Sequence, residues 1–244
     1  LVNPDLAQAR HGRSGGDFAQ GILDNPDTHL CDFCGRPLLG AEYDLLPDGR
    51  ERCGTCSRNT VKDIKELKEL FQTVKDSYCK YFGITIKEPV DVRMVSAREL
   101  SRQSRSTFTP SPKFDARVVG LAVRDRKGYH LLVENGFPRI KVMSTIAHEL
   151  THIWQFTNWD TAAIKARYGA DKAIIVYEGM AVWAQIQYLY GVNEPQAALG
   201  ELHENWSRTD EYGVGLHLYQ SRYGFSESRK PPSKTQFSAG DKPL

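Results

Sequence analysis

The sequence predicts an α+β fold, with a small, mostly antiparallel sheet and several helices preceded by a small cysteine-rich module. Three observations support this prediction. Four cysteines lie close together before residue 60, three strand-like stretches fall between residues 89 and 134, and two long apolar segments of helical character follow them. With 40% hydrophobic and 25% charged residues, the 244-residue chain has an ordinary globular composition and room for one fair-sized domain plus an appendage.

Residues 1–29 are rich in glycine and polar side chains, and we expect them to form a flexible segment. They show no acidic helical pattern of the kind that binds ubiquitin. The chain begins at Leu1 rather than at methionine, which is expected of a trimmed N-terminus. The lack of a targeting segment therefore says little about the location of the protein. A formal net charge of +2 and the lack of any apolar run of about 18 residues predict neither a nucleic-acid partner nor a membrane partner.

The cysteines of residues 30–60 follow the pattern C-x2-C-x18-C-x2-C, which makes Cys31, Cys34, Cys53 and Cys56 metal-ligand candidates. This spacing is typical of a four-cysteine zinc finger, and so short a module needs the metal in order to fold. Four thiolates leave no open coordination position, so this zinc is predicted to be structural. Disulfides are the alternative, although two Cys-x-x-Cys turns make a poor disulfide framework. Zinc thiolates indicate a reducing compartment, and therefore a cytoplasmic location.

Residues 61–83 carry apolar side chains at steps of three and four, which predicts one amphipathic connecting helix ending at Gly83. The fifth cysteine, Cys79, lies near its buried edge as a core residue. We assign residues 84–224 to the main domain, and residues 225–244 have the composition of a disordered tail. The main domain is predicted to contain strands at 89–95, 117–123 and 129–134, a short helix after Ser96, a loop at 101–115 and a helix at 194–206.

The segment Ile146–Trp154 reads H-E-x-x-H inside an apolar helix, which Pro138 is placed to start. Residues four apart lie on one helix face, so His148 and His152 can share a metal ion. Glu149 stands beside the first ligand, where its carboxylate can take a proton from a metal-bound water. Two unrelated core histidines are the alternative interpretation.

A second apolar helix, predicted from Asp171 to Ala184, contains Glu178 as its only acid after the first residue. An unpaired carboxylate in such a setting costs several kcal/mol, so a metal ion is its expected partner. A buried ion pair with arginine or lysine is the alternative. The predicted catalytic zinc ligands are therefore His148, His152 and Glu178, and the chain as a whole is predicted to hold two Zn²⁺ ions.

H-E-x-x-H on one helix and E-G-x-x-x-W on the next resemble the ligand pattern of the gluzincin metallopeptidases. This resemblance implies a zinc metallopeptidase acting on protein or peptide substrates. In such peptidases the strand that leads into the zinc helix, here 129–134, is usually the edge strand on which an extended substrate lies. No G-x-M-E-N-type run, which supplies an amine-binding glutamate in aminopeptidases, precedes the zinc helix, and this favours an endopeptidase.

A more specific resemblance joins the two modules. Five segments occur in the order found in the DA1 family, which this chain resembles. They are the single finger with Asp48-Gly49-Arg50, Gly136-Phe137-Pro138-Arg139, the H-E-x-x-H segment, Glu178-Gly179 and Tyr212-Gly213-Val214-Gly215. Plant members join LIM-type zinc fingers to a zinc peptidase that clips regulatory proteins and is activated by ubiquitylation. Only one four-cysteine module, a LIM-like half, is present here, so a link to ubiquitin rests on the resemblance alone.

Peptide hydrolysis builds negative charge on the carbonyl oxygen, and a tyrosine or histidine donor usually helps zinc to stabilise it. In gluzincins this donor follows the third ligand, which leaves Tyr212, His217, His203 and Tyr219 as candidates. Tyr212 precedes glycines that could turn its ring into the cleft, and His217 is expected near the start of a helix. His203 lies in a polar stretch and is expected to be solvated, and packing alone is the alternative role for Tyr212 and His217.

Two other function classes are compatible with parts of the sequence. A zinc-finger adaptor with an inactive peptidase fold would bind protein partners without cutting them, but such proteins usually lack the base that Glu149 provides here. A nucleic-acid-binding zinc ribbon would need a basic finger, whereas the charges between Asp32 and Arg52 are mixed.

Overall fold

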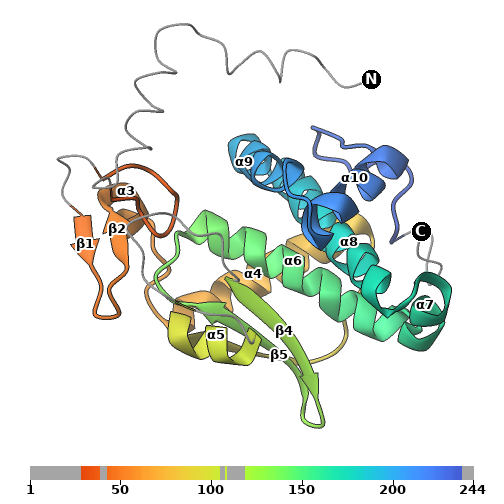
Figure 1. Ribbon diagram of the computed structural model, residues 1–244, viewed down its shortest axis with the longest axis horizontal. Coiled ribbons are helices and arrows are strands. Elements are labelled where there is room, and N and C mark those ends of the chain that lie inside the picture. Colours follow the sequence, from red (N-terminus) through yellow and green to blue (C-terminus); the bar gives the residue numbers. More distant parts are fainter. Residues whose placement is uncertain (1–28, 39–42, 105–107, 109–118, 238–244) are drawn as a thin grey trace, which may run out of the picture. The chain divides into compact units, whose positions relative to one another are not determined.

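A computed structural model describes residues 29–38, 43–104, 108 and 119–237 (Figure 1). The chain divides into two compact units, with the boundary between Thr60 and Val61 and with Phe108 grouped with the first unit. The described residues form a mixed α and β structure with two small sheets and eight helices. The predicted flexible segment at the N-terminus, apart from His29, lies outside them.

The first unit contains a hairpin and a short helix. Strands β1 (Tyr43–Leu45) and β2 (Glu51–Cys53) pair antiparallel, as the Pro-Asp-Gly turn predicts, and helix α3 (Gly54–Arg58) follows directly. Gly35 has the positive φ of 68° that a tight turn requires. Gly54, which follows the second pair's first cysteine, begins helix α3.

The second unit begins with the predicted amphipathic helix α4 (Ile64–Phe82). Asp63 caps its first turn by accepting a bond from the backbone N–H of Glu66 at 2.9 Å, and Gly83 ends it in the left-handed conformation. The remaining helices are α5 (Ala97–Ser104), α6 (Arg139–Asn158), α7 (Thr161–Tyr168), α8 (Ala170–Gly191), α9 (Pro195–Trp206) and α10 (Glu211–Tyr223).

The sheet of the second unit has the order β3 (Val90–Val95), β5 (Gly128–Glu134), β4 (Gly120–Asp125). Strand β3 is parallel to β5 and β4 is antiparallel to it, so the sheet is mixed rather than mostly antiparallel. Strand β5, which leads into α6, is therefore central, and the expectation that it forms an edge is wrong. The reason is that β3, an earlier strand of the chain, pairs with the side of β5 that β4 leaves free.

Helix α6 occupies the middle of the second unit, in contact with β4 and β5 of the sheet as well as with α4 and α8 (Figure 1). Helix α8 in turn packs against α9 and α10. Both central helices are apolar on most sides, which is why each can be covered by several neighbours. Some of the polar side chains that they carry, among them Glu149, Gln155 and Gln185, therefore lie inside the protein.

The tail differs from its prediction. Residues 225–237 have neither helix nor strand, yet Phe237 is buried against the rings of Phe82 and Trp154, with centroids 4.5 Å and 4.9 Å apart. The Trp183 indole also donates to the Gly224 carbonyl at 2.8 Å. The Ser226 N–H also donates to Gln187 and the Tyr223 hydroxyl donates to Gln236, so aromatic and polar contacts together outweigh the polar composition of the segment. Residues 238–244 lie outside the described part of the chain.

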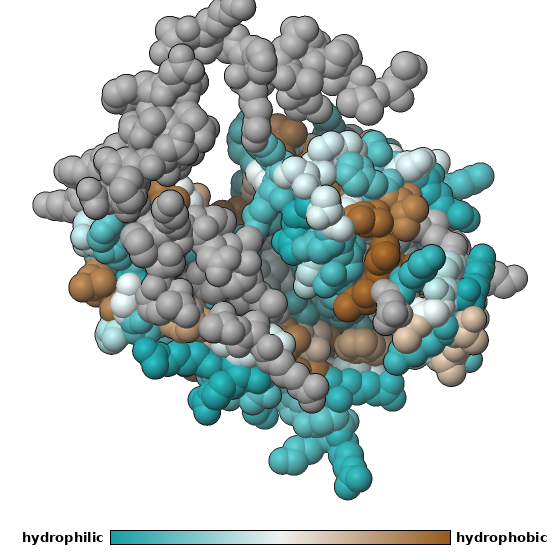
Figure 2. Space-filling view, viewed as in Figure 1, coloured by the Kyte–Doolittle hydropathy of each residue, from teal (hydrophilic) through white to brown (hydrophobic). Residues whose placement is uncertain are grey.

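The face of the molecule in Figure 2 is largely hydrophilic, with small hydrophobic areas between. Among the described residues, no helix is long and apolar enough to cross a membrane.

Candidate metal centres

The four predicted cysteines come together in the first unit. Their sulfur atoms all lie within 4.8 Å of one another, and none is in a disulfide. Zn–S bonds of about 2.3 Å in a tetrahedron would place sulfur atoms about 3.8 Å apart. The Cys34 and Cys53 sulfurs are 3.9 Å apart, so the cluster fits a tetrahedral metal.

Local hydrogen bonds shape this cluster. The backbone N–H of Cys53 points to the Cys31 sulfur at 3.3 Å, and that of Cys56 points to the Cys53 sulfur at 3.5 Å. The Arg50 guanidinium is buried against Asp48, at 2.9 Å, and over the Phe33 ring, which secures the turn before the second pair of cysteines.

The thiols also influence one another. Hydrogen bonds from Cys34 and Cys56 lower the pKa of Cys31 far below its usual value, and donating to Cys31 raises the pKa of Cys34 to about 11. Without a metal the cluster therefore holds its first negative charge easily and resists further ones. A divalent cation would remove that resistance, because it favours the thiolate at every position.

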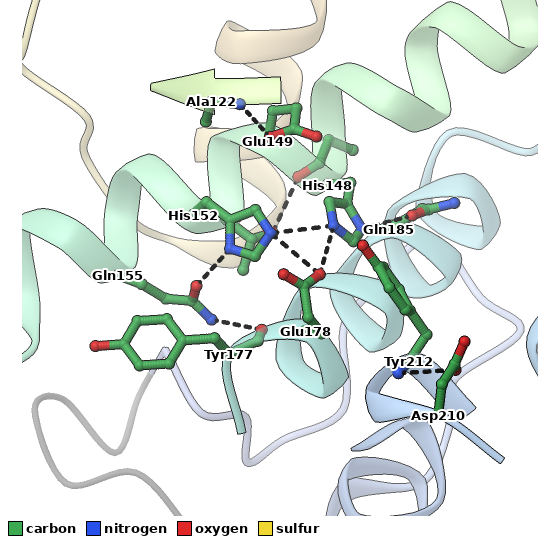
Figure 3. A network of polar contacts seen from close by, with 12 residues as sticks. Ala122, His148, Glu149, His152, Gln155, Tyr177, Glu178, Gln185, Asp210 and Tyr212 are labelled. Carbon is green, nitrogen blue, oxygen red and sulfur yellow. Dashed lines mark hydrogen bonds and ion pairs between the residues drawn. The ribbon is translucent and has the colours of Figure 1, made fainter. Parts of the chain in front are cut away.

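The second cluster joins α6 and α8 (Figure 3). His148 and His152 lie one turn apart on α6, and their Nε2 atoms are 3.1 Å apart. The Glu178 carboxylate from α8 reaches both of them, with Oε2 at 3.2 Å and 3.4 Å from the two nitrogens. Since these three residues come from two helices that are separate in the sequence, the fold itself brings them together.

These separations fit a metal ion. Bonds of about 2.0–2.1 Å to a tetrahedral zinc place neighbouring ligand atoms about 3.3 Å apart, close to the three distances observed. Two nitrogens and one carboxylate oxygen also form the donor set that zinc accepts in sites with an open position. Within the described part of the chain, Glu178 pairs with the two histidines rather than with an arginine or a lysine.

Without a metal ion, His152 of this cluster binds a proton. Burial lowers the pKa of His152, but the Glu178 carboxylate raises it more, so that it stands at about 9. Burial likewise raises the pKa of Glu178, while the two histidines lower it further, to well below its usual range. His152 is thus protonated at neutral pH and points at the same atoms that a cation would contact.

Glu149 lies beside the three ligands, buried between α6 and the sheet. One of its carboxylate oxygens accepts a hydrogen bond from the backbone N–H of Ala122 in β4 at 2.6 Å. Gly120 permits this close approach, because a Cβ there would overlap the Thr145 side chain on α6. The Glu149 charge also contributes to the raised pKa of both His152 and Tyr212, which places it near the cluster.

Tyr212 reaches the cluster from α10. Its ring stacks on that of His148 with a centroid separation of 6.1 Å, and its hydroxyl points toward His148 (Figure 3). Burial, followed by the charges of Glu178 and Glu149, holds the pKa of Tyr212 well above its usual value. The hydroxyl therefore remains protonated and can donate a hydrogen bond.

The glycines near Tyr212 serve close packing rather than a flexible loop. Helix α10 begins at Glu211, with Asp210 as its N-cap, so Tyr212 stands in the first turn of a helix. A Cβ at Gly179 would overlap the backbone of Gly215, which means that α8 and α10 cross with their backbones in contact. This crossing brings Tyr212 next to the helix that carries Glu178.

The other donor candidates lie elsewhere. His217 is exposed, packs edge-on against Trp206 and bonds through Nε2 to the Trp206 carbonyl at 3.0 Å. His203 is exposed on α9. Tyr219 is fully buried, and its hydroxyl has no hydrogen-bond partner among the described residues.

Two glutamines that the sequence analysis did not single out contact the histidines. Gln185 Oε1 lies 3.0 Å from Nδ1 of His148, and Gln155 Oε1 lies 2.8 Å from Nδ1 of His152. A signal was available for Gln155 alone, because polar residues recur on α6 at steps of three and four through an otherwise apolar helix. These residues are Lys141, Ser144, His148, His152 and Gln155.

Comparison with family models, with curated proteins and with solved structures found no match to this chain.

Proposed function

We propose that this protein is a zinc-dependent peptidase that hydrolyses peptide bonds of protein substrates. The observation that carries the proposal is the convergence of His148, His152 and Glu178 at tetrahedral separations with Glu149 directly beside them. A purely structural metal site has no use for a fourth, non-ligating carboxylate at that point, whereas hydrolysis needs a base there.

Zinc bound by the three ligands would supply a Lewis acid that polarises the scissile carbonyl and acidifies water. Glu149 is the general base: its carboxylate accepts a proton from the attacking water and returns it to the leaving amine. The bond from the Ala122 N–H holds one carboxylate oxygen in place, which leaves the other for this proton transfer.

Tyr212 is the residue that assists at the carbonyl oxygen. Its side chain is half-buried, and its hydroxyl is protonated and directed at the cluster, so it can donate a hydrogen bond to an oxygen that gains negative charge. His217 is the weaker candidate, because its ring already bonds to the Trp206 carbonyl.

Strand β4 offers a place for the substrate. It is an edge of the three-stranded sheet, and its Ala122 contacts the proposed base. An extended peptide could pair with such an edge through main-chain hydrogen bonds, which suits an endopeptidase. The four-cysteine finger would then be a structural module or a docking module for substrate or partner.

The resemblance to the DA1 family and to gluzincins in general supports the same assignment. The residues that carry the resemblance are the ligands, the base, Tyr212 and the finger cysteines, and the structure gathers them into the two clusters described above. A connection with ubiquitin or ubiquitylated proteins remains a proposal that rests on this resemblance.

The substitution Glu149→Gln tests the proposal. It keeps the shape of the side chain and removes the base, so cleavage of protein substrates should fall by about 10²–10⁴-fold while zinc content and melting temperature stay at wild-type values. Glu69→Gln, the same change at an exposed position on α4, is the matched control and should cleave normally.

Two other outcomes are informative. A zinc-loaded wild type that cleaves nothing would favour the adaptor that binds protein partners without cutting. A Glu149→Gln protein that still cleaves at a tenth of the normal rate would assign the base to another residue.

A further inference from the structure

Both histidine ligands are held from behind by an amide oxygen. Nδ1 of His148 faces Gln185 and Nδ1 of His152 faces Gln155, while both Nε2 atoms face Glu178. Which ring nitrogen carries hydrogen depends on which end of each glutamine amide points at it. The partners on the other side of each amide decide this.

The Gln155 amide has a fixed direction. Its nitrogen lies 3.0 Å from the Tyr177 carbonyl, which can only accept a hydrogen bond. The amide nitrogen must therefore face Tyr177 and the amide oxygen must face His152. Nδ1 of His152 consequently carries hydrogen, and Nε2 is the nitrogen that is available to a metal.

The Gln185 amide is fixed through a longer chain. Its nitrogen donates to the Ser144 hydroxyl at 2.8 Å, and that hydroxyl donates to the Glu201 carboxylate at 2.9 Å. The same carboxylate oxygen lies 2.8 Å from Nζ of Lys141. A carboxylate paired with lysine only accepts, so Ser144 must donate to it and must accept from Gln185.

The direction of these hydrogen bonds allows only one tautomer of His148. With its nitrogen committed to Ser144, Gln185 presents its oxygen to Nδ1 of His148, so that Nδ1 carries hydrogen and Nε2 presents its lone pair. The intermediate side chains Ser144, Gln185 and Glu201 are 1%, 7% and 7% exposed, so water does not compete for these bonds.

We propose that the ion pair between the half-buried Lys141 and the buried Glu201 sets the direction of a hydrogen-bond chain through Ser144 and Gln185 that fixes the tautomer and orientation of His148. Glu201, Ser144 and Gln185 are thus positioning residues for the metal site, and Gln155 has the same role toward His152. The inference deepens the proposed function and rests on His148 being a metal ligand.

The choice of glutamine has a chemical consequence. A carboxylate behind each imidazole would add negative charge near the metal, whereas an amide orients the ring and leaves it neutral. With Glu178 as the one anionic ligand, a bound zinc would keep a net positive charge, which favours polarisation of a carbonyl group.

The test measures zinc affinity by competition with a fluorescent chelator, using buried glutamines of α8 as a matched pair. Gln185→Met keeps the volume and removes both hydrogen bonds, so zinc affinity at the three-ligand site should fall by about 10–100-fold. Gln187→Met is the control: Gln187 is also buried on α8 but bonds to Tyr81 and Ser226, and zinc affinity should be unchanged. Gln185→Glu restores an acceptor for His148 and should recover most of the lost affinity.

A second readout follows the tautomer. Long-range ¹H–¹⁵N spectra of histidine-labelled protein should show hydrogen on Nδ1 of His148 both with zinc and without it, and Glu201→Gln, whose amide can donate as well as accept, should weaken this preference. Equal zinc affinity of Gln185→Met and wild type, or hydrogen on Nε2 of His148, would overturn the proposal.

A failure of the proposed peptidase function would give a different experimental result from a failure of the tautomer proposal. In that case wild type would bind zinc and show the Nδ1 tautomer but would not cleave protein. A wild type without zinc affinity at this site would remove the metal role of His148, and the proposal with it.

Discussion

The two candidate metal sites differ in how the chain brings their ligands together. In the finger all four candidate ligands come from 26 consecutive residues, Cys31 to Cys56, and the hydrogen bonds that shape them join residues of this same segment. In the second unit the three ligands come from two long helices, and a third helix supplies Tyr212. A metal ion held by the first cluster would be closed in by its four ligands, whereas one held by the second would keep a coordination position open.

This difference teaches how each site depends on its surroundings. A finger of this size buries too little apolar surface to fold without metal, so its metal and its fold should be gained and lost together. The helices of the second unit bury a large apolar core, so the His148–His152–Glu178 site should persist when its metal is removed. The predictions below test this contrast.

The largest expected effect is on the finger. Cys53→Ser removes one of four thiolates, and a structural zinc contributes about 10–16 kcal/mol to folding of such modules. The variant should lose one zinc and the amide protection of residues 43–60, while the melting transition of the second unit stays in place. Metal analysis and hydrogen exchange measure both, with Cys79→Ser as the control that keeps all zinc. Retention of full zinc content by Cys53→Ser would contradict the four-cysteine site.

The next effect is at Tyr212. Tyr212→Phe removes a hydroxyl that donates only as negative charge develops, so kcat should fall by about 10–1000-fold with KM nearly unchanged. Tyr219→Phe on the same helix removes a hydroxyl that has no partner in the described structure, and its kcat should be normal. If His217→Ala lost kcat while Tyr212→Phe kept it, the donor would be His217.

A smaller effect concerns the metal-free protein. His152 has a pKa of about 9 there, above its usual 6.5, so its contribution to stability is complete below pH 6.5 and disappears as the pH rises through 9. Glu178, whose pKa is lowered, contributes above about pH 4.5 and loses that contribution on acidification.

The free energy of unfolding of the metal-free second unit should therefore fall by about 3 kcal/mol between pH 6.5 and 9.5. Chemical denaturation at several pH values measures this change. Glu178→Gln removes the charge that raises the His152 pKa and should flatten the profile. The same slope in the zinc-loaded protein would show that the proton and the metal do not share the site.

The contrast also explains what could be predicted from the sequence. The four finger cysteines can be predicted because their spacing alone brings them together. His148 and His152 can be predicted because they lie one helical turn apart. Glu178 could be predicted because a lone acid in an apolar helix needs a partner. These are properties of short segments.

The features that escaped prediction depend on distant segments. The central position of β5 follows from its pairing with β3. Residues 225–237 are ordered through contacts with the second unit, among them the packing of the Phe237 ring against Phe82. Gln185 could not be connected with His148 until α8 was packed against α6, and Gly215 looked like a loop residue until α10 crossed α8. Tertiary contacts decide each of these.

The most direct test of the account measures zinc content and protein cleavage on the same sample during stepwise dialysis against a chelator. The account predicts two zinc ions per chain at the start, loss of cleavage in proportion to loss of the first ion, retention of the second ion, and full recovery when one equivalent of zinc is returned. Cleavage that continues after the first ion has gone, or two ions that leave together, would contradict a chain that holds one closed structural site and one open catalytic site.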